Sequence, residues 1–132
     1  MVIELSLSKD FVPEWNGNME LPPGEQIVIS HKAPTMQLYQ SLMPKPALKM
    51  VTNLEGTITG GESEYTIDNA KLVAEMVTLI KNLEVSIDGT VTPVTTARQL
   101  LKDAPAVVSG LVDEIGAYLQ NLLSTKVVDA KN

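Results

Sequence analysis

Residues 105–124 read PAVVSGLVDEIGAYLQNLLS, and this stretch decides the fold of the chain. Its apolar residues recur at steps of three and four, which is the spacing of one face of an α-helix. They are Val108, Leu111, Val112, Ile115, Tyr118, Leu119, Leu122 and Leu123. Pro105 suits a first helical turn because proline lacks a backbone N–H and has a helical φ. The sequence therefore predicts a long C-terminal helix with a broad apolar face.

Three shorter helices are expected upstream, over residues 34–43, 68–81 and 95–102. Each opens on a residue type suited to a helix start, a proline in the first and an aspartate or threonine in the others. In the last of them either Thr95 or Thr96 can be the cap. Together with residues 105–124, these segments predict a helical body.

Two β-hairpins are expected around these helices. Residues 2–7 alternate apolar and polar, residues 26–31 form a short β-branched run, and we expect the two strands to pair. Residues 83–92 form the second hairpin, because Asp88-Gly89 between two alternating runs is a strong signal for a tight turn.

Two segments lack a clear period. Residues 10–24 are rich in Pro, Gly and Asn, which predicts a loop, and the rings of Phe11 and Trp15 can hold that loop against the body. Residues 47–65 contain several glycines and a polar run, which predict a mobile connection.

These expectations give an α+β, helix-rich fold with a C-terminal helical bundle and small β-hairpins near the N-terminus and mid-chain. The 132 residues fit a single domain, 1–132. Within it we distinguish a β-hairpin region (1–32), a helical region (34–124) and a polar, frayed tail (125–132).

The charge distribution excludes several classes of partner. Ten Lys and Arg stand against sixteen Asp and Glu, and the single arginine is Arg98. Binding to nucleic acid or to an anionic membrane needs clustered positive charge, so neither is expected. The sequence has no cysteine, which excludes disulfides and thiolate metal sites. No secretion signal or long apolar run is apparent, and we expect the chain to act in the cytoplasm.

No residue pattern predicts catalysis, a cofactor or a metal. His31 is the one histidine, and we expect it to be exposed or hydrogen-bonded in a structural role. The glycines of residues 56–61 lack the Gly-Lys-Ser/Thr ending of a phosphate loop, so a turn or hairpin tip is expected there. Two acidic groups, Glu62/Glu64/Asp68 and Asp113-Glu114, are expected to be solvated. We therefore expect a chain that is not an enzyme.

The broad face of the last helix leaves two interpretations open. Both flanks can be buried within one small domain, or one flank can serve self-association or receive an apolar helix from a partner protein. For the second interpretation, the predicted protein-binding residues are Leu111, Ile115, Leu119 and Leu122.

Several short motifs resemble the tail assembly chaperones of long-tailed phages. In the first half they are Val12-Pro13-Glu14-Trp15-Asn16-Gly17-Asn18, Glu20-Leu21-Pro22 and Glu25-Gln26-Ile27-Val28. In the second half they are Leu79-Ile80-Lys81-Asn82-Leu83, Ile87-Asp88-Gly89, Val94-Thr95-Thr96-Ala97, Leu100-Leu101 and Val112-Asp113-Glu114-Ile115. The resemblance spans roughly residues 11–123.

This resemblance implies a function without catalytic residues. Members of the family are mainly helical and act in the cytoplasm of the infected or lysogenic bacterial host. They bind the phage tail tape measure protein and keep it soluble until the tail tube assembles around it. The two predicted hairpins depart from the family pattern. The alternative is a small structural component of the virion, such as a tail or head-completion protein.

Overall fold

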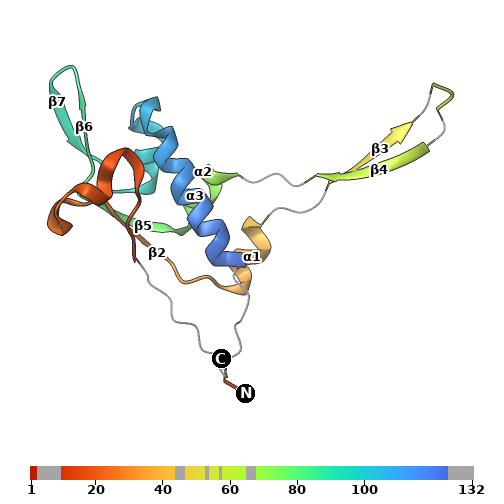
Figure 1. Cartoon of the computed structure of the whole chain (residues 1–132), viewed down its shortest axis with the longest axis horizontal. Coiled ribbons are helices and arrows are strands. Elements are labelled where there is room, and N and C mark those ends of the chain that lie inside the picture. Colours follow the sequence, from red (N-terminus) through yellow and green to blue (C-terminus); the bar gives the residue numbers. More distant parts are fainter. Residues whose placement is uncertain (3–9, 44–46, 53, 57, 65–67, 125–132) are drawn as a thin grey trace.

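The computed structural model describes residues 1–2, 10–43, 47–52, 54–56, 58–64 and 68–124. The fold is α+β and helix-rich, as the sequence predicts (Figure 1). The helices are α1 (Met36–Leu42), α2 (Asn69–Met76) and α3 (Ser109–Ser124), with short helical turns η1 (Trp15–Glu20), η2 (Pro23–Glu25), η3 (Gln99–Asp103) and η4 (Ala106–Val108). The strands are β1 (Asp10–Phe11), β2 (Val28–His31), β3 (Ala47–Thr52), β4 (Ile58–Glu64), β5 (Val77–Lys81), β6 (Glu84–Ile87) and β7 (Thr90–Pro93).

Helix α3 forms the centre of the body and packs against α2 (Figure 1). Its apolar stripe joins side chains of β2, α2, β5 and η3 in one core. The two helices approach closely at Gly116, where an added Cβ would collide with the side chain of Asn69. The long C-terminal helix is therefore confirmed, and Gly116 is the residue that lets α2 lie against it.

The helix starts follow the caps that the sequence indicates. The Asp68 carboxylate accepts a hydrogen bond from the Lys71 N–H at the start of α2 (3.1 Å). The Thr96 hydroxyl accepts one from the Gln99 N–H (3.1 Å), and the Gln99 side chain accepts one in return from the Thr96 N–H (3.2 Å). This reciprocal pair is a capping box, so Thr96 is the cap of the segment that ends in the π-helical turn η3.

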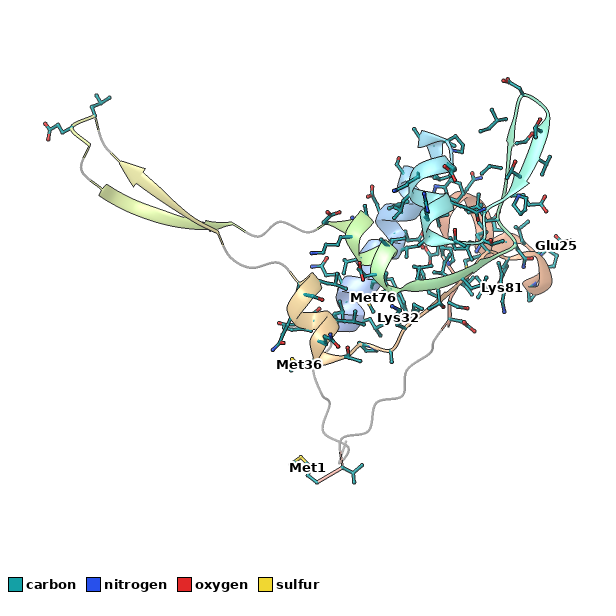
Figure 2. All side chains as sticks on the ribbon, turned by 180° about the vertical axis from the view of Figure 1, so that it is seen from behind. Met1, Glu25, Lys32, Met36, Met76 and Lys81 are labelled. Carbon is teal, nitrogen blue, oxygen red and sulfur yellow. The ribbon has the colours of Figure 1, made fainter. Side chains whose placement is uncertain are left out.

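The helix predicted over residues 68–81 is wrong in its last part. Helix α2 ends at Met76, and residues 77–81 form β5, which pairs antiparallel with β2 and places Ile29 opposite Ile80. The Lys32 N–H also donates to the Met76 carbonyl (2.8 Å), which links β2 to the end of α2 (Figure 2). The open edge of β2 and the β-branched Val77, Thr78 and Ile80 favour a strand over further helix.

The N-terminal hairpin differs from its predicted form. The strand predicted at 26–31 is confirmed as β2, but most of its predicted partner, 2–7, lies outside the described residues. Strand β2 instead lies between β5 and the two-residue strand β1, which pairs Phe11 with Ile29. A two-residue strand carries too short a pattern to be found from the sequence.

The mid-chain hairpin is confirmed as β6 and β7, with Ile87 opposite Thr90. Asp88 has a φ of 50° and Gly89 a φ of 82°. Two consecutive positive φ values define the tight turn that matches the twist of a hairpin, and Asp-Gly is a favoured pair for it. Pro93 is the last residue of β7.

The interpretation of residues 47–65 as a mobile connection missed two strands. Strands β3 and β4 pair antiparallel, with Lys49 opposite Glu62, and Figure 1 shows this hairpin projecting away from the body. The chain turns at residues 54–56, where Gly56 has a φ of 79°. Gly60 and Gly61 lie inside β4 and interrupt the apolar pattern by which a strand is normally found.

Candidate protein-binding surface

The face predicted to bind a partner is the interior face of α3. Leu111, Ile115 and Leu119 are each 0% exposed, and Leu122 is half-buried. These side chains already contact the core of their own chain, so the folded body does not present three of them to a partner. This location corresponds to the other interpretation, in which the stripe is buried within the domain.

A different part of the body presents apolar side chains around a hollow. A cleft of about 350 Å³ lies between η1, the β5–β6 turn and η4. Its lining residues are Trp15, Asn16, Asn18, Leu21, Ile27, Asn82, Leu83, Glu84, Val85, Ser86, Pro105, Val107 and Val108. Leu83 and Val108 are buried, whereas Leu21 and Val107 are 44% and 73% exposed. The cleft therefore has an apolar base with exposed apolar residues beside it.

Asn18 shapes one wall of this cleft. The residue is buried, and its Nδ2 donates to the carbonyls of Pro13 (2.8 Å) and Ile27 (3.1 Å). Its Oδ1 accepts a hydrogen bond from the Ile27 N–H (2.6 Å). One amide thus replaces the backbone pairing that the loop lacks, which offsets the cost of burying polar groups. The Asn18 amide is therefore hydrogen-bonded within the fold, and we do not assign it a role in binding a ligand.

Glu114 fixes the same wall to α3. Its carboxylate oxygens accept hydrogen bonds from the Glu14 N–H (2.6 Å) and the Trp15 N–H (2.9 Å). Glu114 is half-buried, and beyond the solvated face expected for it, its carboxylate satisfies two N–H groups at the start of η1. Gly110 leaves room for the indole ring, since an added Cβ there would lie 3.2 Å from the Trp15 Nε1. The predicted packing of Trp15 against the body is confirmed.

Asn82 forms the opposite wall. It has a φ of 63°, in the left-handed region that asparagine tolerates better than most residues. Its Nδ2 donates to the carbonyls of Gly24 (3.1 Å) and Gln26 (2.9 Å). The β5–β6 turn is thereby tied to the segment before β2, which keeps the two sides of the cleft at a fixed separation.

The sequence offered no direct signal for this cleft. Val107 was assigned to the beginning of the last helix, but it lies in η4, and α3 starts two residues later. The asparagines that fix the walls lie in turn-rich segments, where asparagine usually serves a local turn. Their contacts are with residues distant in the chain, and a pattern within one segment cannot reveal these.

His31 is confirmed as a hydrogen-bonded structural residue. It is buried, with Nδ1 2.9 Å from the Lys32 carbonyl oxygen and Nε2 3.0 Å from the Tyr118 hydroxyl. A carbonyl only accepts, so Nδ1 carries a proton. Burial, and secondarily the negative charge of Asp10, raises the pKa of Tyr118 above 10.0. Phe11 stacks on Tyr118 with the ring centroids 4.1 Å apart, which confirms that Phe11 holds the N-terminal loop.

The acidic residues do not assemble into a metal site in the part of the chain that the structure describes. No group of three His, Cys, Asp or Glu side chains there could hold a metal ion. Asp68 caps α2, whereas the side chains of Glu62 and Glu64 lie outside the described set. Among the helices of the described residues, none is long and apolar enough to cross a membrane.

Comparison with known proteins identifies no relative of this chain. No family model matches the chain, and no curated protein and no solved structure matches it.

Proposed function

We propose that this chain is a non-enzymatic tail assembly chaperone, which binds the phage tail tape measure protein in the cytoplasm of the infected or lysogenic bacterial host. The resemblance of its short motifs to that family supports the proposal. The motif residues Trp15, Asn18, Leu21 and Asn82 also line the cleft, so part of the resemblance coincides with a surface feature.

The observation that carries the proposal is the apolar cleft beside Trp15. An unassembled tape measure protein exposes apolar helical stretches, and such stretches aggregate unless they are covered. A helix can place an apolar side chain over Leu83 and Val108, and Leu21 and Val107 can contact its flanks. The net charge of −6 keeps such a complex apart from other copies.

The experiment is co-expression with the tape measure protein from the same genome, followed by a solubility assay and affinity capture. Wild-type chain is expected to keep the large protein in the soluble fraction and to co-purify with it. Val107→Asp is expected to lose both effects, because it places a charge beside the apolar base of the cleft. Val91→Asp is the matched control, since Val91 is 57% exposed on β7, outside the cleft lining.

The outcomes separate binding from folding. Both variants should keep the far-ultraviolet circular dichroism of the wild type, because both residues are exposed. If the wild type neither solubilises nor captures the tape measure protein, the chaperone proposal fails. If Val107→Asp captures it as well as Val91→Asp does, the cleft is not the binding surface.

The projecting β3–β4 hairpin favours a second candidate, a small structural component of the virion. A hairpin that leaves the body can reach a neighbouring subunit in a particle (Figure 1). A structural component is present in purified virions at a fixed copy number, whereas a chaperone of this kind is expected to be absent from them. Quantitative mass spectrometry of purified particles therefore distinguishes the two functions.

A further inference from the structure

The cleft beside Trp15 is lined by one charged residue, and that residue is acidic. It is Glu84, the first residue of β6, and its side chain is exposed. Glu84 lies opposite Pro93 in the β6–β7 hairpin, so no basic side chain faces it across the strand pair. The edge of the cleft on β6 is therefore negatively charged.

A second exposed carboxylate lies on the wall that η1 forms. Glu20 is the last residue of η1 and precedes Leu21, which lines the cleft. A Cβ placed on Gly17 would lie 3.6 Å from the Glu20 Oε2, and Gly17 directly follows the lining residue Asn16. The Glu20 carboxylate therefore lies beside the turn of η1 that borders the cleft.

The segments that form the cleft contain no basic residue. Residues 10–31, 82–94 and 104–124 hold four, two and two acidic residues and no lysine or arginine. The basic residues nearest to the lining in sequence are Lys81 and Lys102, and neither of them lines the cleft. No positive charge within these segments therefore offsets the carboxylates around the apolar base.

This arrangement matches one kind of partner helix. Its apolar side chains can contact the buried Leu83 and Val108, and basic side chains on its flanks can reach Glu84 on one side and Glu20 on the other. Lysine and arginine suit such positions, because their long apolar stems cover apolar surface while the charge stays in water. Acidic flanks would instead bring like charges together, which disfavours binding.

We propose that the segment bound in this cleft is a cationic amphipathic helix, with lysine or arginine on both flanks of its apolar stripe. This inference rests on the proposed function in one respect, namely that the cleft is the surface that binds a partner. It adds which helices of a partner the cleft selects. The apolar base attracts many helices, and the carboxylates distinguish among them by charge.

The test uses the full chain and two synthetic helical peptides without tryptophan. Both peptides carry the same leucine stripe, with lysines on the flanks of one and glutamates on the flanks of the other. Trp15 is the single tryptophan and lines the cleft, so its fluorescence emission reports on binding. At low salt the lysine peptide is expected to bind at least about tenfold more tightly than the glutamate peptide. The difference should shrink at high salt, which screens exposed charges.

Glu84→Lys reverses the charge in the lining. It is expected to weaken binding of the lysine peptide about five- to tenfold and to strengthen binding of the glutamate peptide by a similar factor, because attraction and repulsion are exchanged. Glu75→Lys is the control, since it makes the same change in net charge at an exposed position of α2, outside the cleft lining. Circular dichroism verifies that both variants are folded.

Three results would overturn the inference: a lysine peptide that does not bind the wild type, a wild type that binds both peptides equally, or a Glu75→Lys variant that loses as much affinity as Glu84→Lys. Co-expression with the tape measure protein tests the chaperone proposal separately. A chain that captures that protein but does not select the lysine peptide keeps the chaperone proposal and overturns this one. A chain that selects the lysine peptide but fails in co-expression does the reverse.

Discussion

The N-terminal loop and the β3–β4 hairpin are both long excursions from the helical body, but the chain holds them in opposite ways. The loop over residues 10–27 has almost no regular pairing, and side chains of Asn18, Asn82 and Glu114 satisfy its backbone groups. The hairpin over residues 47–64 has regular pairing along both strands, and its contacts are mainly between these strands.

The difference teaches that regular secondary structure and attachment to the body are separate properties. An irregular segment is fixed when buried polar side chains replace the missing backbone partners. Among the contacts of the described residues, the hairpin shows no such ties, and it projects from the body as an arm (Figure 1). Substitutions near the loop should therefore change the stability of the body, and substitutions in the hairpin should not.

The largest contrast in stability is expected between two Leu→Asp substitutions, one in the core and one at the tip of the hairpin. Leu119→Asp places a carboxylate at a position that is 0% exposed in the core, and Leu54→Asp places one at the hairpin tip, where Leu54 is fully exposed. An unpaired buried charge costs several kcal/mol, a large share of the stability of a small domain. Leu119→Asp is expected to unfold the chain, and Leu54→Asp to change the unfolding free energy by less than about 0.5 kcal/mol.

Urea denaturation followed by circular dichroism measures both effects. A folded Leu119→Asp variant with near wild-type stability would mean that α3 does not form the core. It would restore Leu111, Ile115, Leu119 and Leu122 as candidates for a partner surface.

The next largest effect on the unfolding free energy is expected in the N-terminal loop. Asn18→Ala removes three hydrogen bonds and leaves the buried Ile27 N–H without its acceptor. A buried donor without a partner costs about 1–3 kcal/mol, so a loss of about 2–3 kcal/mol is expected. Gln37→Ala, at an exposed position of α1, is the control and should cost under about 0.5 kcal/mol.

Trp15 is the single tryptophan, so its fluorescence reports on this loop directly. Asn18→Ala is expected to shift the emission to longer wavelength or to lower the unfolding midpoint, since the ring packs against Gly110. An unchanged midpoint together with an unchanged spectrum would show that Asn18 does not hold the loop.

The parts of the fold that follow from local chemistry were predictable from the sequence. Asp88-Gly89 placed the β6–β7 turn, and the apolar spacing of residues 105–124 gave the central helix. The strand β5 was not predictable, because Val77 and Ile80 also continue the helical spacing of α2. Its strand form depends on β2, which lies about fifty residues earlier in the chain.

The candidate site was less accessible to sequence reasoning. An apolar stripe looks the same whether it faces the core or a partner, so Ile115 could not be assigned from its spacing. The cleft depends on hydrogen bonds from Glu114 to Trp15 and from Asn82 to Gly24, which join separate segments. Such contacts leave no periodic signal.

A smaller effect on the unfolding free energy is expected when the contact between His31 and Tyr118 is removed. Tyr118→Phe leaves His31 Nε2 without its hydrogen-bond partner, at a cost of about 1 kcal/mol. The folded pKa of Tyr118 lies above 10.0, and burial is the main cause. The contribution of protonated Tyr118 to the unfolding free energy is therefore fully present below pH 10. It is lost as the pH rises through the folded pKa.

The measurement is the unfolding free energy of wild type and Tyr118→Phe from pH 8 upward. The wild type should lose stability above pH 10, and the variant should lose less. Tyr39→Phe, at an exposed position of α1, should follow the wild type. A wild type and a Tyr118→Phe variant with parallel pH profiles would show that Tyr118 does not carry this effect.

The smallest effect on stability is expected from the largest change in sequence. Replacing residues 47–64 with a short Gly-Ser linker removes the whole β3–β4 hairpin and leaves the core residues in place. The cost of closing a loop changes only slowly with its length, so the body should keep its melting temperature within a few degrees.

A shortened chain that melts far below the wild type would contradict the comparison between the two regions, since the hairpin would then support the body through contacts along its length. A shortened chain that melts normally would leave the comparison intact, because the core of the body lies outside the hairpin. Normal melting is the result that fits an arm whose strands pair mainly with each other.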